Sequence, residues 1–342
     1  MDLIAFGTVF LEIVFGQVQA LPGPGEEIYA DEFAISCGGG AVTVASAARG
    51  FGVRAGLSSV LGDDLGSRVV EEHCRRLGVD LSPSRYVAGR VAGITVVLNF
   101  EGDRAFVSYV PPRPAERPEA EQWLDVLRDY RPAWCYLHAG SGVSGLLREA
   151  RSLGVKIALD LALNDIADHR DAVLECAPLA DVFLPNTEEL MRLTGAGTLA
   201  AAIGAAAELS PCVVVKRGPD GAVVADRTGR TYVTEGLRPV VVRDRTGAGD
   251  AFAGALIGAL CTGASITEAA AKGNEAGSRT VSMLGAVGEV EVEGLSAAAP
   301  LLAASLLRTA AGDHMAGDRM AAGDRRVPRA RDEPNGHGRG GR

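Results

Sequence analysis

Residues 240–256 read Val-Val-Val-Arg-Asp-Arg-Thr-Gly-Ala-Gly-Asp-Ala-Phe-Ala-Gly-Ala-Leu, and this stretch decides the fold class. We expect an apolar strand at 240–242, a glycine-rich turn at 247–249 and an alanine-rich helix that begins near Asp250. Free N–H groups at a helix start, together with the helix macrodipole, attract phosphate oxygens, and glycines allow a close approach. The stretch therefore predicts an anion-binding turn, in which Asp250 is either a helix cap or a functional carboxylate.

The nine residues from Asp244 to Phe252 resemble the C-terminal signature of the ribokinase-like (PfkB) carbohydrate kinases, except that Arg245 stands where that family more often has a small or hydroxyl residue. The resemblance implies an α/β fold of three layers, α/β/α, with a mostly parallel central sheet and a small β lid. It also implies ATP-dependent phosphorylation of a hydroxyl, with Asp250 as the general base. Phosphoryl transfer needs mainly positioning, charge neutralisation and one such base. The implied anion hole is the turn formed by Gly247, Ala248 and Gly249.

Two further segments resemble family motifs, and each also has a purely structural interpretation. Residues 36–45 resemble the Gly-Gly signature beside the sugar, although a glycine triplet before a small-residue helix also serves close packing. Residues 184–189 resemble the Asn-x-x-Glu motif of the magnesium–phosphate network, although the same residues would form a helix capping box. By resemblance, the first segment supplies the substrate-binding residues Gly38, Gly39 and Thr43, and the second holds Mg²⁺, mostly through water, with Asn186 and Glu189.

A buried strand and turn at 213–221 resemble the family segment that lines the nucleotide. The resemblance implies that ATP contacts this segment and the loop at Gly285 and Ala286. Some relatives also bind a monovalent cation such as K⁺ beside the anion hole, and the implied ligands here are carbonyls near Asp244 and Thr246. The nucleotide-binding residues implied in this way are Asn186, Lys216, Gly218, Thr246 and Asn274.

The acceptor side departs from the family. Glu12 stands where the segment beginning at Gly7 usually ends in an aspartate, and Thr43 stands where the glycine signature usually has an asparagine. An added methylene moves a carboxylate by about an ångström, which matters where catalysis depends on alignment at that scale. Because the phosphate side is intact, we expect an active kinase with an unusual acceptor, bound in part by Glu12.

Three functions are kept in view. The first is a kinase of a sugar or sugar derivative. The second is a nucleoside kinase of the same family, which would be favoured by an aromatic residue such as Phe10 or Phe106 stacked on a base. The third is a sugar- or nucleotide-binding relic without turnover, against which the intact Asp250 argues.

Composition limits the class of protein. The chain has 342 residues, 47% of them hydrophobic, and a formal net charge of −9, which favours a large core and argues against a nucleic-acid partner. No apolar run reaches the length of about 18 residues that a membrane span needs. Without a basic, hydrophobic leader at the N-terminus, a cytoplasmic protein is expected. Its six cysteines are widely spaced, which is typical of reduced core residues.

The coarse pattern alternates strands with helices, which predicts a parallel sheet covered on both faces. We expect one kinase domain over 1–309, a lid at 10–36 and 88–110, and a disordered tail at 310–342 with too few apolar residues to bury. A homodimer through the lid is a further expectation. The strands are expected at 2–6, 55–59, 134–138, 156–160, 182–184, 213–216 and 240–242, and the helices at 41–50, 66–76, 119–128, 143–152, 169–176, 198–208, 249–261 and 266–283.

Overall fold

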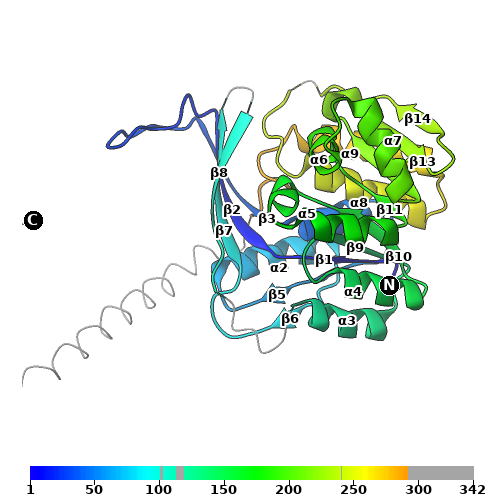
Figure 1. Ribbon diagram of the computed structural model, residues 1–342. Coiled ribbons are helices and arrows are strands. Elements are labelled where there is room, and N and C mark those ends of the chain that lie inside the picture. Colours follow the sequence, from blue (N-terminus) through cyan, green and yellow to red (C-terminus); the bar gives the residue numbers. More distant parts are fainter. Residues whose placement is uncertain (101–102, 113–118, 240, 292–342) are drawn as a thin grey trace, which may run out of the picture. The chain divides into compact units, whose positions relative to one another are not determined.

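An eight-stranded sheet runs through the protein in the order β14-β13-β12-β11-β10-β9-β1-β4 (Figure 1). The computed structural model describes residues 1–100, 103–112, 119–239 and 241–291, which belong to the compact unit Met1–Glu291. The strands from β4 to β12 in this order are parallel, and β13 and β14 are antiparallel. Their bounds are β1 (Leu3–Phe6), β4 (Ala55–Ser58), β9 (Trp134–His138), β10 (Lys156–Asp160), β11 (Val182–Phe183), β12 (Cys212–Lys216), β13 (Ala222–Asp226) and β14 (Thr231–Thr234).

The parallel strands are buried on both faces because their sequences are apolar without alternation. All four residues of β1, Leu-Ile-Ala-Phe, are buried, as are the last four residues of β10. Continuous apolar runs are typical of strands covered by helices on either side. Ile4, Leu137 and Leu159, from three neighbouring strands, share one hydrophobic cluster with residues of the covering helices.

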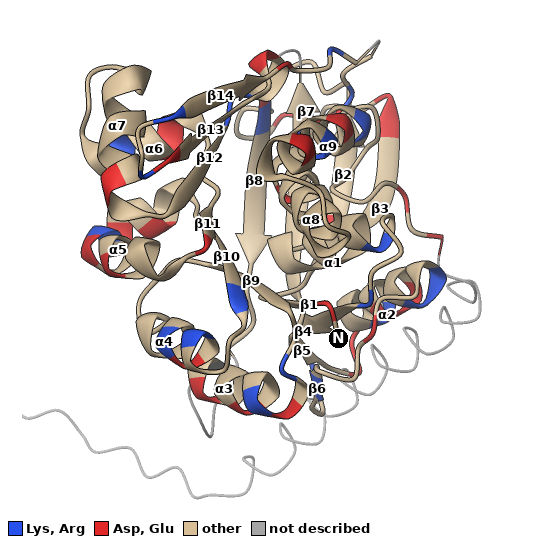
Figure 2. Ribbon diagram, turned by 90° about the vertical axis from the view of Figure 1, so that its right-hand side faces the viewer, with Lys and Arg blue, Asp and Glu red and all other residues tan. Residues whose placement is uncertain are grey.

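Helices cover both faces of this sheet (Figure 2). On one face lie α1 (Gly40–Arg49), α8 (Ala248–Cys261) and α9 (Ile266–Thr280), and on the other lie α3 (Glu119–Tyr130), α4 (Ser144–Ser152), α5 (Leu163–Cys176), α6 (Thr187–Thr194) and α7 (Leu199–Leu209). Helix α1 packs closely on α8 at Gly254, which has no side chain. A Cβ atom there would lie 2.3 Å from the Val44 carbonyl oxygen. This three-layer arrangement confirms the predicted fold class.

A second sheet, which we call the lid sheet, has four strands in the order β3-β2-β7-β8 and stands beside the central sheet (Figure 1). Its strands lie in the segments expected to form the lid, except that β3 extends two residues further: β2 (Phe10–Gly16), β3 (Glu32–Gly38), β7 (Gly93–Phe100) and β8 (Asp103–Tyr109). One face of the lid sheet packs its residues Val14, Ala34 and Val97 against Leu284. Helix α2 (Leu65–Leu77) and a small sheet of β5 (Val60–Leu61) and β6 (Arg85–Tyr86) complete the unit, with short 3-10 helices at Ala177–Leu179 and Gly218–Asp220.

Most of the predicted elements are confirmed, and the exceptions have local causes. The strand expected at 240–242 is wrong for its described residues, because Val241 and Val242 are half exposed and lie outside both sheets. The hairpin of β13 and β14 was not predicted. Helix α5 begins at Leu163 and contains a kink at His169, where the prediction began. The predicted tail and residues 292–309 lie outside the described residues.

Two further features concern expectations from composition. All six cysteines are free thiols, and four of them are buried. Among the described residues, no single helix has the length and apolar character to cross a membrane, although the bent pair of α6 and α7 meets that criterion by length and composition only.

Candidate active site

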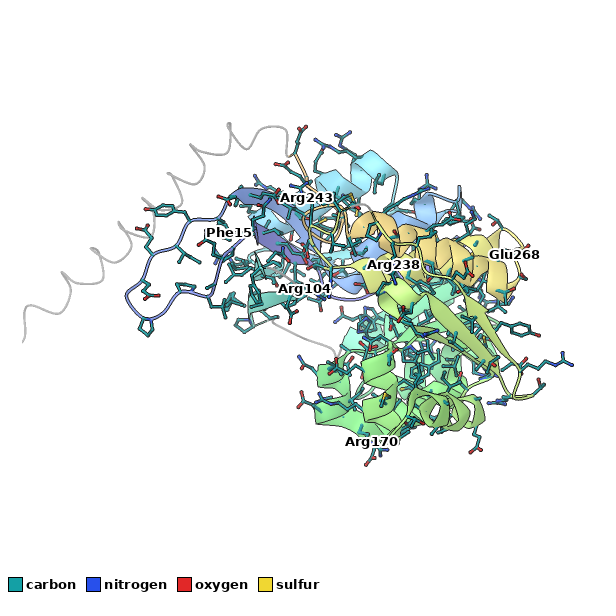
Figure 3. The ribbon with its side chains drawn as sticks, turned by 90° about the horizontal axis from the view of Figure 1, so that it is seen from above. Phe15, Arg104, Arg170, Arg238, Arg243 and Glu268 are labelled. Atoms are coloured by element: carbon teal, nitrogen blue, oxygen red, sulfur yellow. The ribbon has the colours of Figure 1, made fainter. Side chains whose placement is uncertain are left out.

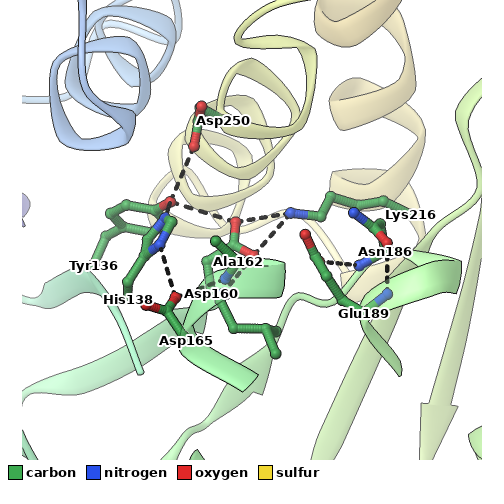
Figure 4. Close-up of polar contacts among 10 residues, drawn as sticks. Tyr136, His138, Asp160, Ala162, Asp165, Asn186, Glu189, Lys216 and Asp250 are labelled. Carbon is green, nitrogen blue, oxygen red and sulfur yellow. Dashed lines mark hydrogen bonds and ion pairs between the residues drawn. The ribbon is translucent and has the colours of Figure 1, made fainter. Parts of the chain in front are cut away.

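Polar residues stand at the carboxyl ends of four neighbouring parallel strands. β9 ends at His138, β10 ends at Asp160, Asn186 follows β11, and β12 ends at Lys216 (Figure 4). The carboxyl ends of parallel strands meet at one edge of a sheet, which is where ligands bind in this class of fold. Sequence motifs predicted Asn186 and Lys216 as site residues, whereas His138 and Asp160 were not predicted. A polar residue that closes an apolar strand was the signal available for both.

The glycine turn places Asp250 at this edge. Gly247 has a φ of +74°, and a Cβ atom there would lie 2.6 Å from the Ala286 Cβ atom, so only glycine fits without strain. Helix α8 begins at Ala248, one residue before the predicted range of 249–261, which puts Asp250 in its first turn. The Asp250 Oδ1 atom accepts a hydrogen bond from the Tyr136 hydroxyl at 3.3 Å, and within the described part of the chain it caps no backbone N–H group. The helix-cap interpretation of Asp250 is therefore not supported.

A chain of polar contacts connects Asp250 to Lys216 (Figure 4). The Tyr136 hydroxyl lies 3.3 Å from carboxylate oxygens of both Asp250 and Asp160, and 3.1 Å from His138 Nε2. The Lys216 ammonium donates to both oxygens of Asp160 at 2.8 Å. On the other side of the ring, His138 Nδ1 lies 3.6 Å from a carboxylate oxygen of Asp165. Tyr136 is thus the link between the carboxylate of helix α8 and the ion pair of the sheet.

Burial and neighbouring charges shift the pKa values of the residues at both ends of this set of contacts. Burial raises the pKa of Asp250, and Asp160 adds to the rise, while His138 and Lys216 partly offset it. Burial lowers the pKa of Lys216, but the carboxylates of Asp160 and Glu189 outweigh that effect, so its pKa lies above the ordinary value. The site therefore combines a permanently charged ammonium with a carboxylate that is a stronger base than an exposed aspartate.

The ligand atoms of His138, Asp160 and Asp250 all lie within 4.8 Å of one another, which is close enough to share a metal ion. Lys216 argues against that use, because its ammonium already contacts both oxygens of Asp160. The side chains of this ion pair are 12% and 2% exposed. The ammonium thus occupies the position at Asp160 that a metal cation would need.

The glycine triplet brings helix α1 against Asp250. Gly39 has a φ of +101°, and a Cβ atom there would lie 2.1 Å from the Thr8 carbonyl oxygen. A Cβ atom at Gly40 would lie 2.6 Å from Asp250 Oδ1. Close packing is therefore one role of the triplet, because a side chain at Gly40 would collide with the Asp250 carboxylate. Thr43, on the same helix, has a buried hydroxyl without a hydrogen-bond partner among the described residues.

Glu12 lies at the junction of the lid sheet and the central unit. Its side chain is 6% exposed and covers Gly38, where a Cβ atom would lie 1.9 Å from Glu12 Oε1. Its other oxygen accepts a hydrogen bond from the Ala286 N–H group at 3.3 Å. Burial raises the pKa of Glu12 to about 7, and the charges of Asp244 and Asp250 add to the rise. Its role as an acceptor ligand stays a prediction.

This shift predicts a pH-dependent stability effect. From pH 4.5 to about pH 7 the unfolded chain has lost the Glu12 proton while the folded chain still holds it, so stability falls as pH rises through this window. Glu12→Gln removes this titration. The free energy of unfolding of the variant should therefore increase relative to that of the wild type as the pH is raised from 5 to 8, by about 3 kcal/mol at most. Urea unfolding of both proteins at the two pH values measures the difference. An identical difference at both would contradict the assignment.

Asn186 and Glu189 form the capping box that the sequence allowed. Asn186 Oδ1 accepts the Glu189 N–H group at 2.9 Å, and Glu189 Oε2 accepts the Asn186 N–H group at 2.7 Å. Glu189 is 8% exposed, and burial raises its pKa to about 7 while Lys216 opposes the rise. Its Oε1 atom has no hydrogen bond among the described residues. A buried carboxylate with one free oxygen fits the binding of a water held by a cation.

A largely apolar cavity of about 330 Å³ adjoins the start of helix α8. Three of the residues predicted for the nucleotide, Lys216, Gly218 and Asn274, line it. The other predicted residues, Asn186, Thr246 and the loop at Gly285 and Ala286, do not. Asn274 also holds the end of β14, because its Nδ2 group donates to Thr234 Oγ1 at 3.0 Å and to the Glu235 carbonyl at 2.9 Å. The other lining residues are Pro219, Gly221, Leu237, Pro239, Val242, Arg245, Ala248, Gly249, Phe252, Gly277, Ser278 and Val281.

Asp244 fastens the glycine turn to the following loop. Its Oδ1 atom accepts the Thr246 N–H group at 2.8 Å, and its Oδ2 atom accepts the Gly285 N–H group at 2.9 Å. Both carboxylate oxygens are thus engaged by backbone. The cation ligands that the family resemblance implies here are carbonyl groups, and the monovalent site stays a prediction.

Comparison with known proteins gives one family. The family model for the pfkB family carbohydrate kinases matches residues 2–292. Curated relatives include fructoselysine 6-kinase of Escherichia coli strain K12, which is 26% identical with 73% of this chain and 91% of the relative covered. An ATP-dependent ribose-1-phosphate kinase of Halopiger xanaduensis is 31% identical, with 73% and 82% covered, and a cytidine kinase of Thermococcus kodakarensis is 26% identical, with 80% and 94% covered.

A solved structure shares the fold. The crystal structure of a putative ribokinase from Agrobacterium tumefaciens aligns with a TM-score of 0.71 at 20% identity, covering 85% of this chain and 94% of that one. The family match extends over the whole described unit, and the glycine turn, Asp250 and the capping box at Asn186 all lie within it. The chain therefore belongs to the pfkB family of carbohydrate kinases.

Proposed function

We propose that this ATP-dependent sugar or nucleoside kinase uses Asp250 as the general base and the turn at Gly247, Ala248 and Gly249 as its anion hole. The observation that carries the proposal is the position of Asp250, which stands in the first turn of α8, directly after a glycine turn and beside a cavity that the turn helps to line. A carboxylate so placed can take the proton of an acceptor hydroxyl as that oxygen attacks phosphorus.

We assign the phosphates of ATP to the start of α8. Ala248, Gly249 and Lys216 line the 330 Å³ cavity, and a Cβ atom at Gly249 would lie 3.5 Å from Lys216 Nζ. Free backbone N–H groups and an ammonium would together stabilise the charge that develops on the transferred phosphoryl group. Lys216 would act as a fixed cation there, since Asp160 holds it from the opposite side.

Magnesium fits the residues at the neighbouring helix α6. Glu189 and Asn186 would hold Mg²⁺ largely through water, because this ion gives up its hydration shell reluctantly. When bound, the ion neutralises phosphate charge. The chain's own contribution is the carboxylate of Glu189, whose Oε1 atom accepts no hydrogen bond in the described residues, on a helix whose start is fixed by the capping box.

We favour a sugar derivative over a nucleoside as the acceptor. A nucleoside base would need an open aromatic face. The Arg104 guanidinium covers the ring of Phe106 at 5.4 Å, and the ring of Phe10 packs over Gly93. The ring of Phe10 is therefore occupied, and one face of the half-exposed Phe106 ring is covered. A cytoplasmic location and a homodimer through the lid stay predictions.

An ADP-release assay with Mg-ATP across sugars, sugar derivatives, polyols and nucleosides tests this function. Turnover of a sugar derivative with kcat/KM well above that of any nucleoside is the expected result. Preference for a nucleoside would establish the second candidate. Tight binding of acceptor and ATP without ADP release would show a non-catalytic protein and overturn the assignment of Asp250.

The magnesium assignment makes a separate prediction. Glu189→Gln should raise the Mg²⁺ concentration for half-maximal rate by roughly 10-fold, because a charged acceptor of metal-bound water is lost. The helix should persist, since glutamine also completes a capping box. The matched control is Glu188→Gln, which removes an exposed carboxylate from the same first turn. If magnesium titrations of both variants overlay the wild type, Glu189 is only a helix cap.

A further inference from the structure

His138 is a partly exposed histidine at the carboxyl end of β9 that the proposed mechanism does not use. Its two ring nitrogens have different neighbours. Nδ1 lies 3.6 Å from a carboxylate oxygen of Asp165 in α5. Nε2 lies 3.1 Å from the Tyr136 hydroxyl, which itself lies 3.3 Å from Asp250 Oδ1. Figure 4 shows that these four side chains form one row of contacts between α5 and α8.

The start of helix α1 shows that His138 and Asp250 also approach each other directly. A Cβ atom at Gly40, the first residue of α1, would lie 2.6 Å from Asp250 Oδ1 and 3.3 Å from His138 Nε2. The ligand atoms of the histidine and the aspartate lie within 4.8 Å of each other. A protonated imidazole at this distance favours the ionised form of a carboxylate.

The Tyr136 hydroxyl has one proton and three neighbours that can accept it. Carboxylate oxygens of Asp250 and Asp160 lie 3.3 Å away, and a neutral His138 ring would accept the proton at Nε2. When His138 is protonated, Nε2 donates to the Tyr136 oxygen, so the tyrosine proton is left for the carboxylates. Lys216 already donates to both oxygens of Asp160. Asp250 is then the neighbouring carboxylate without another donor in the described residues.

The surrounding charges favour the protonated form of His138. Burial lowers the pKa of His138, but nearby carboxylates, that of Asp165 first, outweigh this effect, so the pKa lies above its ordinary value. Burial raises the pKa of Asp250, and His138 opposes that rise more strongly than Lys216 does. The charged groups of the surrounding elements are Asp160 of β10, Asp165 of α5, Glu189 of α6, Lys216 of β12 and Asp250 of α8.

We propose that His138, held by Asp165, is a positioning residue that directs the Tyr136 hydroxyl to Asp250 and keeps the Asp250 carboxylate ionised. The inference rests on the proposed function and names the group that prepares its general base. In the reaction, the acceptor hydroxyl gives its proton to Asp250, its oxygen bonds to the γ-phosphorus, and the bond from that phosphorus to the ADP oxygen breaks. The protons of His138 and Tyr136 stay in place.

NMR of protein labelled with ¹³C at the aspartate carboxyl carbons measures the pKa of Asp250 without turnover, and the Asp250→Asn variant identifies its signal. His138→Gln should raise the pKa of Asp250 by about one pH unit, because glutamine can still donate to Tyr136 but carries no charge. Tyr136→Phe should also raise the pKa of Asp250, since the carboxylate loses its hydrogen-bond donor.

The ring signals of His138 give the reverse measurement. Asp250→Asn should lower the pKa of His138 by the amount that His138→Gln raises the pKa of Asp250, because the coupling between two proton-binding sites is reciprocal. Asp165→Asn should lower the pKa of His138 as well, since the ring loses its charged partner. The asparagine oxygen can still accept the Ala162 N–H group, which keeps the start of α5 in place.

The pH dependence of kcat/KM tests the consequence for turnover. The rate falls at low pH as Asp250 gains a proton, and His138→Gln should move this fall upward by about one pH unit. The variant should therefore be about 10-fold slower than the wild type at low pH, and the loss should shrink as the pH rises. Glu12 and Glu189 also titrate near pH 7, so the shift between the two proteins, and not either midpoint, reports His138.

His169→Gln and Asp168→Asn are the matched controls for loss of a histidine and of an aspartate. Both residues are exposed on α5, and Figure 3 shows the next residue, Arg170, at the outer edge of the molecule. Neither control should move the pKa of Asp250 or the pH dependence of kcat/KM.

The two proposals fail in different ways. An unchanged pKa of Asp250 in His138→Gln, in a protein that phosphorylates an acceptor, would reject the role of His138 and leave the kinase function intact. A raised KM for the acceptor with an unchanged pH profile would also overturn the inference, because His138 would then be a substrate contact. Reciprocal pKa shifts in a wild-type protein that releases no ADP with any acceptor would confirm the coupling and reject the kinase function.

Discussion

Asp250→Asn should lower kcat by roughly 10²–10⁴-fold, because an amide cannot accept the proton of the acceptor hydroxyl. The substitution keeps the shape of the side chain, and the amide oxygen of the introduced asparagine can still accept the hydrogen bond from Tyr136. We therefore expect an unchanged urea unfolding midpoint and an unchanged affinity for a non-hydrolysable ATP analogue. Steady-state assays with purified protein give kcat, and quenched single-turnover measurements of ADP formation give the rate constant of the chemical step free of product release.

Glu268→Gln provides the matched control for this variant. Glu268 is also an acidic residue in the first turn of a helix, but it caps α9 on the surface. If Asp250 only stabilised the start of its helix through its negative charge, the two variants would lose activity to the same small extent. Turnover of the Asp250 variant within a few fold of the wild type would reject the base and leave a structural carboxylate.

Lys216→Met should destabilise the fold by about 3–5 kcal/mol, because it leaves the Asp160 carboxylate buried without its cation. Asp160 is 2% exposed and accepts Lys216 at 2.8 Å through both oxygens. Methionine keeps most of the volume of the lysine stem, so the loss reports charge rather than packing. Urea unfolding with a constant m value gives the change in free energy.

Adding Asp160→Asn to Lys216→Met shows how much of the lost stability comes from the unpaired Asp160 charge. The double variant should recover part of the stability that Lys216→Met lost, since no unpaired charge remains. Arg148→Met is the control. It breaks the ion pair between Arg148 and Glu175, two side chains that are about half exposed, and should hardly move the unfolding midpoint. If Lys216→Met were no worse than this control, the buried pair would not support the site.

The kinase function was predicted from local sequence because one contiguous stretch resembles the signature of the family. The nine residues from Asp244 to Phe252 contain the turn, its glycines and the carboxylate. The strands of the central sheet were equally visible, since their apolar runs are buried on both faces. Even the capping box at Asn186 follows from a spacing of three residues. Each of these features is determined by neighbours in the chain.

The prediction of a strand at 240–242 was wrong because a strand depends on a partner that is distant in the chain. Val241 and Val242 have the composition of a strand, but no neighbouring strand pairs with them, and their side chains are half exposed. Strand formation requires a partner in space, which composition does not name. The hairpin of β13 and β14 was missed likewise, because β13 is defined by its antiparallel pairing with β12.

The sequence by itself determined the family, the sheet and the place of Asp250 at a helix start. Only the tertiary structure decided that Tyr136, 114 residues away, bonds to Asp250, and that Asp160 pairs with Lys216 across 56 residues. It also decided that Glu12 bonds to the Ala286 loop. Propensities and motifs act over a few residues, whereas these contacts exist because parallel strands align their carboxyl ends and the lid sheet closes over them.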